Sequence, residues 1–202
     1  MKSAESVVGV ILAGGKSTRM GGGDKCLLPL AGRPVLASVI ARLRPQVSDI
    51  VINANGEPAR FANFGLPVVG DSVTGFAGPL AGVHAGLEWV KVNRPDAHYV
   101  VSVASDTPFI PDNLVQRFLS ELNHHSGFLV AASAVGLHPV IGLWTVAMGP
   151  DLQLCGLGRP KSESVLLPRR STAHSRLEAS GRSFFAFYQL AAGFNPRGTG
   201  AP

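Results

Sequence analysis

The chain has 202 residues, 46% of them hydrophobic and 15% charged, which is enough to bury the core of one folded domain and argues against disorder. Its formal net charge of +5 lies mostly in the tail, because residues 1–150 hold 11 basic and 10 acidic residues whereas residues 151–202 hold 7 and 3. Basic and aromatic side chains do not interleave there, so we expect no nucleic-acid partner.

No apolar run is long enough to span a membrane, and Glu5 interrupts the only stretch that imitates a signal peptide. The two cysteines, Cys26 and Cys155, offer neither a disulfide framework nor a metal-binding spacing. The pair His124-His125 is more typical of a solvated turn than of a metal site. We therefore expect a cytoplasmic protein with no membrane association.

The first predicted element is a buried strand over residues 7–13, an apolar run that ends at the glycine-rich segment 14–25. Glycines allow backbone N–H groups to approach an anion closely, and the segment also carries the cations Lys16, Arg19 and Lys25. This combination indicates a polyphosphate, and hence a nucleotide site. The alternative is an ordinary surface turn.

Two common phosphate-binding motifs do not fit this segment. Residues 15–17 supply the Gly-Lys-Ser end of a P-loop, but the first glycine that the motif requires falls on Val10. The dinucleotide fingerprint fails too, because Cys26 stands where its third glycine belongs.

Helices and strands alternate along the following sequence. We expect helices over residues 34–44 and 112–122, and a further helix that has Pro79 near its start and runs through about residue 90. We also expect a short helix or turn over 57–64, and strands over 49–53, 66–69, 99–104, 128–134 and 140–146, the last at or near a sheet edge. A second glycine-rich loop covers residues 73–82. This alternation predicts an α/β fold with a mainly parallel sheet covered on both faces. After about residue 148 the periodicity is lost, and residues 183–190 are the only candidate strand in an irregular tail.

Ligands of such sheets bind beyond the carboxyl ends of the strands. The segment 14–25, Asn53, Asp71 and Asp106 each follow a predicted strand, so we expect them to meet at one edge. Asp106 is the candidate ligand for Mg²⁺, which prefers one or two carboxylates together with phosphate oxygens. For the three polar residues the alternative role is the capping of a turn.

Lys25 and Arg19 are suited to neutralising phosphate charge, and arginine can bind two oxygens at once. The sequence contains no evident Ser/His/Asp or Cys/His nucleophilic arrangement. We therefore expect positioning and charge stabilisation, as in phosphoryl or nucleotidyl transfer.

These features together resemble a known family. The segment LAGGKSTRMGGGDK is similar to the nucleotidyltransferase signature L-A-G-G-x-S-x-R-M-G-x-x-K, and further motifs resemble the molybdenum cofactor guanylyltransferases, or MobA proteins. Those motifs are GRPVL at 32–36, RLRPQV at 42–47, INAN at 52–55, GPLAG at 78–82, SDTPF at 105–109 and HPVIGLW at 138–144.

The resemblance implies a single Rossmann-like domain, a three-layer sandwich that transfers GMP from GTP to molybdopterin and releases pyrophosphate. It implies that Asp106 binds GTP and Mg²⁺ and acts in catalysis with Arg19 and Lys25. The GTP-binding residues that it implies are Leu12, Ala13, Gly14, Lys25, Asn53, Asp71 and Asp106. Other proteins of molybdenum cofactor biosynthesis are further expected partners.

The tail departs from the family. We expect a nucleotidyltransferase domain over residues 1–148 and an atypical segment over 149–202, where only Phe194-Asn195-Pro196 matches the usual family ending. A shifted reading frame is one explanation. Two alternative functions stay open: a nucleotidyltransferase that uses CTP or a sugar phosphate, and a GTP- or pterin-binding protein without turnover.

Overall fold

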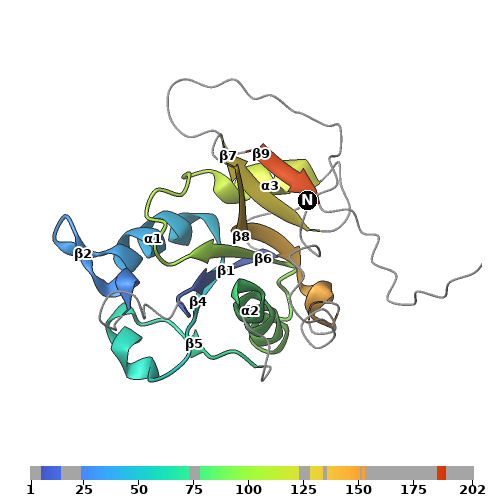
Figure 1. Cartoon of the computed structure of the whole chain (residues 1–202). Helices are drawn as coiled ribbons and strands as arrows, with labels where there is room; N and C mark the ends of the chain where they lie inside the picture. Colours follow the sequence, from blue (N-terminus) through green and yellow to red (C-terminus); the bar gives the residue numbers. More distant parts are fainter. Residues whose placement is uncertain are drawn as a thin grey trace, which may run out of the picture.

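The computed structural model describes residues 6–14, 24–72, 78–122, 128–133, 136–150, 152 and 186–189. Within this part of the chain, a seven-stranded sheet has the order β5-β4-β1-β6-β8-β7-β9, with helices packed on it (Figure 1). The strands are β1 (Val7–Leu12), β4 (Asp49–Asn53), β5 (Val68–Val69), β6 (Tyr99–Ala104), β7 (Leu129–Ser133), β8 (Gly136–Thr145) and β9 (Ala186–Gln189). The helices are α1 (Val35–Leu43), α2 (Pro79–Asn93) and α3 (Leu114–Leu122), with short 3-10 turns η3 (Lys25–Leu27), η4 (Arg44–Gln46), η5 (Pro58–Phe64) and η6 (Val146–Met148).

Four neighbouring strands, β5, β4, β1 and β6, form the parallel half of the sheet. Leu12 is the register partner of both Asn53 and Ala104, so β1, β4 and β6 end level with one another. A level edge brings the residues that follow these strands close together, as the sequence predicts for a ligand site.

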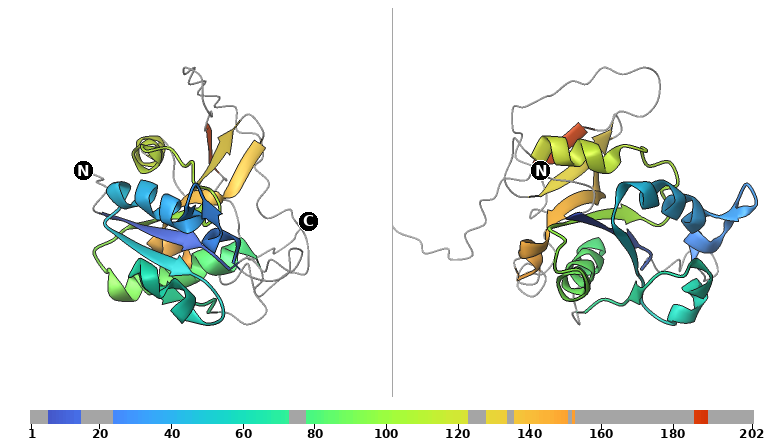
Figure 2. Two further views of the ribbon diagram at one scale, coloured as in Figure 1. Left: turned by 90° about the vertical axis from the view of Figure 1, so that its left-hand side faces the viewer. Right: turned by 180° about the vertical axis from the view of Figure 1, so that it is seen from behind.

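Two apolar layers cover the sheet, and the alternation of β1 assigns its side chains to them. Val7 and Ile11 pack in the layer that contains α1 and α3, whereas Val8 and Val10 pack in the layer that contains α2. Figure 2 shows α1 and α2 on opposite sides of the sheet. The single α/β domain and its three layers are therefore confirmed.

The prediction that the strand over residues 140–146 lies at or near a sheet edge is wrong. β8 begins earlier, at Gly136, and lies inside the sheet, between β6 and β7. Pro139 cannot donate to a ladder, and in β8 it falls within a register shift, where Ala131 pairs with His138 and Val130 with Gly142.

The other predicted helices and strands are confirmed within a few residues of their ends, and the candidate strand at 183–190 is present as β9. A small hairpin, β2 (Pro29–Leu30) with β3 (Arg33–Pro34), is an addition, and its turn carries positive φ values at Ala31 and Gly32. In the described residues we find no helix with the length and apolar character needed to cross a membrane.

Candidate functional site

The end of β1 is held from both sides by backbone hydrogen bonds. The amide of Ala13 donates to the carbonyl of Asn53 (2.8 Å), and the amide of Ser105 donates to the carbonyl of Leu12 (3.1 Å). Gly14, which is exposed, follows directly. The three strand ends are thus joined into one edge, and Leu12, Ala13 and Gly14 lie on it as predicted.

Asn53 and Asp71 meet at this edge. Asn53 is buried, with 3% of its surface exposed, and its Nδ2 donates to Asp71 Oδ1 (3.0 Å). Asn55 holds the other side of the aspartate: its Nδ2 donates to Asp71 Oδ2 (2.6 Å), and its Oδ1 accepts from the Asp71 amide (2.8 Å). Both oxygens of the carboxylate therefore accept hydrogen bonds from amides, which fixes its orientation.

One glycine makes room for the Asn53 side chain. A Cβ on Gly82, in the first turns of α2, would approach Asn53 Cγ and Leu12 Cδ2 to 2.8 Å each, whereas a Cβ on Gly14 would make an ordinary contact, 3.7 Å from Asn53 Oδ1. The glycine of the GPLAG motif thus lets α2 approach the end of β4 closely.

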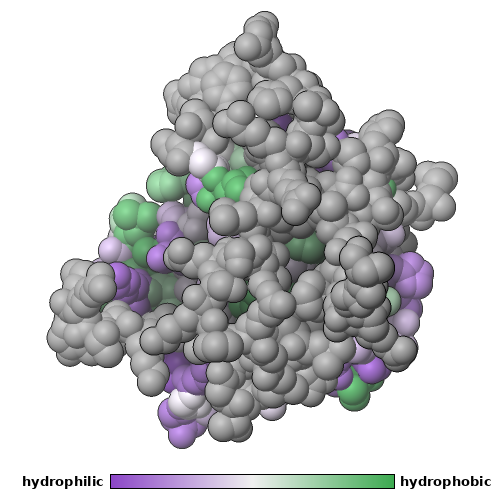
Figure 3. All heavy atoms as spheres, turned by 45° about the vertical axis from the view of Figure 1, so that its right-hand side comes forward, coloured by the Kyte–Doolittle hydropathy of each residue, from purple (hydrophilic) through white to green (hydrophobic). Residues whose placement is uncertain are grey.

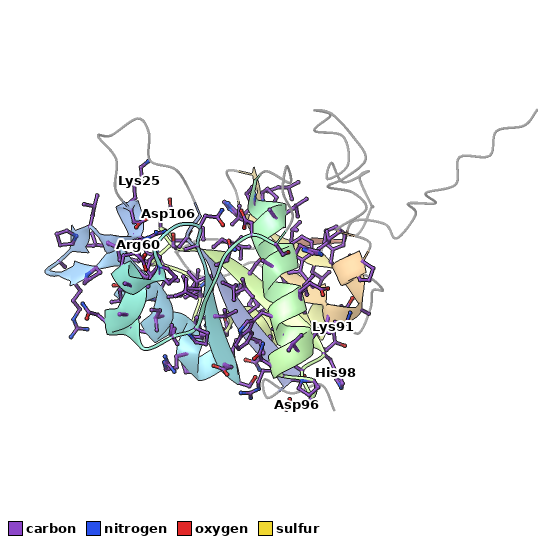
Figure 4. All side chains as sticks on the ribbon, turned by 90° about the horizontal axis from the view of Figure 1, so that it is seen from below. Lys25, Arg60, Lys91, Asp96, His98 and Asp106 are labelled. Atoms are coloured by element: carbon purple, nitrogen blue, oxygen red, sulfur yellow. The ribbon has the colours of Figure 1, made fainter. Side chains whose placement is uncertain are left out.

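Lys25 and Asp106 are brought near each other by the residues beside them. Lys25 begins η3 and Asp106 follows β6, and both side chains are exposed. Their neighbours, Cys26 and Ser105, are buried and are joined by a side-chain hydrogen bond. Figure 4 shows Lys25 and Asp106 at one end of the molecule, and Lys91, Asp96 and His98 at the other.

Burial, reinforced by the charge of Asp24, raises the pKa of the Cys26 thiol above its ordinary value of 9.0, although the hydrogen bond with Ser105 and the charge of Arg60 act in the opposite direction. Because the thiolate is the nucleophilic form, a raised pKa keeps this cysteine unreactive near neutral pH. Cys26 therefore acts as a buried contact and not as a nucleophile.

An ion pair closes the site on the side of η5. Arg60 Nε lies 2.6 Å from Asp24 Oδ2, as a charge pair and not as a linear hydrogen bond. The Arg60 guanidinium also packs over the ring of Phe61, with its Cζ 4.7 Å from the ring centroid. Arg60, Asn55 and Asp24 were not predicted as site residues, because their contacts join segments that no local pattern relates.

Several predicted residues lie outside the described part of the chain. They are Lys16 and Arg19, the loop at residues 73–77, the pair His124-His125 and most of the tail. Among the residues that are described, no group of three or more histidine, cysteine or acidic side chains could hold a metal. The exposed carboxylate of Asp106 is the kind of group that Mg²⁺ binds together with phosphate oxygens.

In the part of the chain that the structure describes, apolar side chains are exposed at several separate places. Among the described residues, the large exposed ones are Leu28, Leu30, Val92 and Phe109. Figure 3 shows green, apolar atoms in several separate places on the face that it draws. The charged and amide groups at the strand ends are thus the more specific feature of the surface.

The sequence model of the MobA-like NTP transferase domain matches residues 9–174. The chain belongs to this family. Within it, a molybdenum cofactor guanylyltransferase of Rhodopseudomonas palustris (strain BisB5) is 54% identical over 145 residues, which cover 71% of this chain and 69% of that protein. Another, from Bradyrhizobium sp. (strain ORS 278), is 53% identical over 149 residues, covering 73% of this chain and 70% of the relative.

Solved structures share the fold. Molybdopterin-guanine dinucleotide biosynthesis protein A from Archaeoglobus fulgidus superimposes with a TM-score of 0.57 at 19% identity, over 74% of this chain and 73% of that one. A protein of Mycobacterium tuberculosis H37Rv, solved in complex with manganese, gives a TM-score of 0.52 at 19% identity, over 73% and 74% of the two chains. At these identities the likeness supports the α/β architecture alone.

Proposed function

We propose that this protein is a molybdenum cofactor guanylyltransferase, which transfers GMP from GTP to the phosphate of molybdopterin and releases pyrophosphate. The observation that carries the proposal is the convergence of Lys25, Asp106 and the Asn53–Asp71 pair at the level ends of β1, β4 and β6. The two guanylyltransferase relatives, each more than half identical over about 145 residues, supply the choice of substrates.

Each group has a role that its chemistry supports. The backbone of Leu12, Ala13 and Gly14 would bind GTP, with its N–H groups facing phosphate oxygens. Lys25 would neutralise phosphate charge as an exposed ammonium group. We assign the same task to Arg19 on its motif, since a guanidinium can hold two oxygens at once.

Asn53 and Asp71 would contact the nucleoside. The hydrogen bond between them leaves the pair rigid before the ligand arrives, which reduces the entropy lost on binding. Asp106 would contact GTP and hold Mg²⁺. When bound there, the metal would offset the negative charge of the triphosphate.

In the reaction, an oxygen of the acceptor phosphate attacks the α-phosphorus of GTP in line. The new O–P bond forms as the bond from the α-phosphorus to the bridging oxygen breaks, and pyrophosphate departs with that electron pair. The acceptor is already anionic, so no strong general base is required. The residues of the site serve to position the two anions and to stabilise charge.

The remaining assignments follow from this function. We propose residues 1–148 as the catalytic domain and residues 149–202 as an atypical C-terminal segment, with a cytoplasmic location and other molybdenum cofactor biosynthesis proteins as partners. The family match continues to residue 174, so part of that segment is alignable with the family.

One experiment separates the readings. The protein is incubated with Mg²⁺, molybdopterin and either GTP or CTP, and pyrophosphate and dinucleotide are measured. We expect turnover with GTP only. Turnover with CTP would show that the protein is a nucleotidyltransferase that uses CTP. Tight GTP binding without product would show that it is a GTP-binding protein without turnover.

A further inference from the structure

Ala13 and Asp24, which lie before and after the glycine-rich residues, belong to one connected set of contacts. The amide of Ala13 donates to the carbonyl of Asn53. Asp24 forms the ion pair with Arg60, and both side chains are largely buried, with 19% and 27% exposed. Lys25 follows Asp24 directly, so the position of this aspartate governs that of the lysine.

Arg60 connects Asp24 with Asn55. Its Nη2 donates to the carbonyl of Asn55 (2.6 Å) and its Nη1 to the carbonyl of Glu57 (3.2 Å). The side chain of Asn55 in turn grips Asp71 through two hydrogen bonds. The contacts therefore run without interruption from Asp24, through Arg60 and Asn55, to Asp71.

The local backbone is shaped around the guanidinium. Gly56 has a φ of +87°, in the left-handed region that glycine adopts without strain, and a Cβ there would approach Arg60 Nη1 to 2.9 Å. Each of the three nitrogens of Arg60 contacts a different group. A lysine carries its three donors on a single nitrogen, so it cannot place donors at three separate positions in a plane. The position therefore suits arginine in particular.

We propose that Arg60 is a positioning residue that sets the separation between Lys25 and Asp71, and so tunes the affinity for GTP without touching the reacting atoms. The inference rests on the proposed function, because it assigns phosphates to Lys25 and the nucleoside to Asp71. A nucleotide held at two points needs both points at the correct spacing, and a small displacement of either one weakens binding.

The test compares Arg60→Met, which keeps the aliphatic bulk, with Arg94→Met as the matched control. Arg94 forms an ion pair of similar burial with Asp49 (2.8 Å; 33% and 31% exposed) at the amino ends of the strands. We expect Arg60→Met to raise the KM for GTP about tenfold with kcat changed much less. Arg94→Met should leave both constants unchanged. An unchanged KM in Arg60→Met, with wild type active, overturns the inference.

A double-mutant cycle with Asp24→Asn isolates the ion pair. Because Asp24 acts through Arg60, the double variant should bind GTP about as weakly as Arg60→Met alone. Losses of GTP affinity that add strictly in the double variant would contradict the coupling between Asp24 and Arg60. Asp24→Asn also serves as the second variant if Arg60→Met fails to fold.

A readout without ligand separates this inference from the proposed function. The amide of Leu27 donates to the carbonyl of Asp24 (2.9 Å), and that of Leu28 to the carbonyl of Lys25 (3.1 Å). We expect these two amides to exchange hydrogen faster in Arg60→Met than in Arg94→Met or wild type. Equal exchange overturns the positioning role whether or not GTP binds, whereas faster exchange in a protein that binds no GTP would refute the proposed function alone.

Discussion

Each end of the parallel strands carries a partly buried ion pair that joins distant segments: Asp24 with Arg60 at the carboxyl ends, and Asp49 with Arg94 at the amino ends. At the amino ends the amide of His98 donates to the carbonyl of Ser6 (2.9 Å), and the exposed Asp96 lies 4.0 Å from Arg94. At the carboxyl ends, the exposed Lys25 and Asp106 lie on the same edge as the Asn53–Asp71 pair. The same kind of contact thus joins segments of the fold at one end and lies beside the proposed ligand site at the other.

The largest expected effect is on kcat, and it is tested by removing one exposed carboxylate at each end of the parallel strands. Asp106→Ala should lower Mg²⁺-dependent kcat by at least about 100-fold, because it removes the metal ligand and its charge. Its melting temperature should stay near that of wild type, since the side chain is exposed. Asp96→Ala, an exposed carboxylate at the opposite end, is the control and should keep full activity. A near wild-type rate for Asp106→Ala would exclude this residue as the metal ligand.

A pair of glycines on α2 gives the next effect. In Gly82→Ala the new Cβ would meet Asn53 and Leu12, whereas in Gly86→Ala, one turn further on, it would meet Val10 Cγ2 at 2.6 Å. Both variants should lose about 1–3 kcal/mol of unfolding free energy through overpacking. Only Gly82→Ala displaces Asn53, so only this variant should also raise the KM for GTP in steady-state kinetics. Equal KM values for the two would show that the position of Asn53 does not matter.

A smaller effect concerns pH and the buried contact beneath Lys25 and Asp106. The pKa of Cys26 is raised in the folded protein, so folding favours the protonated thiol. Its contribution to stability is complete below the unfolded pKa, near 9.0, and is lost as pH rises through the folded pKa.

Urea unfolding at pH 7 and pH 10 measures this contribution. Wild type should lose more unfolding free energy across the interval than Cys26→Ser, whose side chain does not titrate there. The same loss in both proteins would mean that the thiol ionises as readily in the fold as outside it.

The smallest effect is expected at the amino ends. Asp49→Asn weakens the pair with Arg94, which is about one third exposed, and should cost at most about 1 kcal/mol of unfolding free energy. The KM for GTP should not move. A rise in KM here would remove the distinction between the two ends of the sheet.

Most of the fold could be predicted from the sequence, because apolar runs and the turn residues beside them indicate the same strands and helices. Residues 49–53 and 99–104 are short apolar runs next to polar turns, and the structure has strands at those bounds. β8 was misjudged because its place in the sheet depends on pairing with β6 and β7, which strand composition does not reveal. The hairpin β2–β3 is too short to show a periodic pattern.

Part of the candidate site could be predicted, because ligands of parallel sheets bind beyond the carboxyl ends of the strands. The carboxyl-end rule brought Asn53, Asp71 and Asp106 to one edge. It could not reveal Arg60, whose partners Asp24 and Asn55 are set by the folded path of η5, nor the buried contact of Cys26 with Ser105. Such contacts exist only after the fold has formed, so no local pattern reports them.

The most direct measurement is hydrogen exchange with and without GTP and Mg²⁺. The account predicts slower exchange in segments at the carboxyl ends, over residues 12–14, 53–55 and 104–107, and no change over residues 94–98 at the amino ends. Protection confined to the amino ends, or spread equally over both, would contradict a nucleotide site at the edge that carries Lys25 and Asp106.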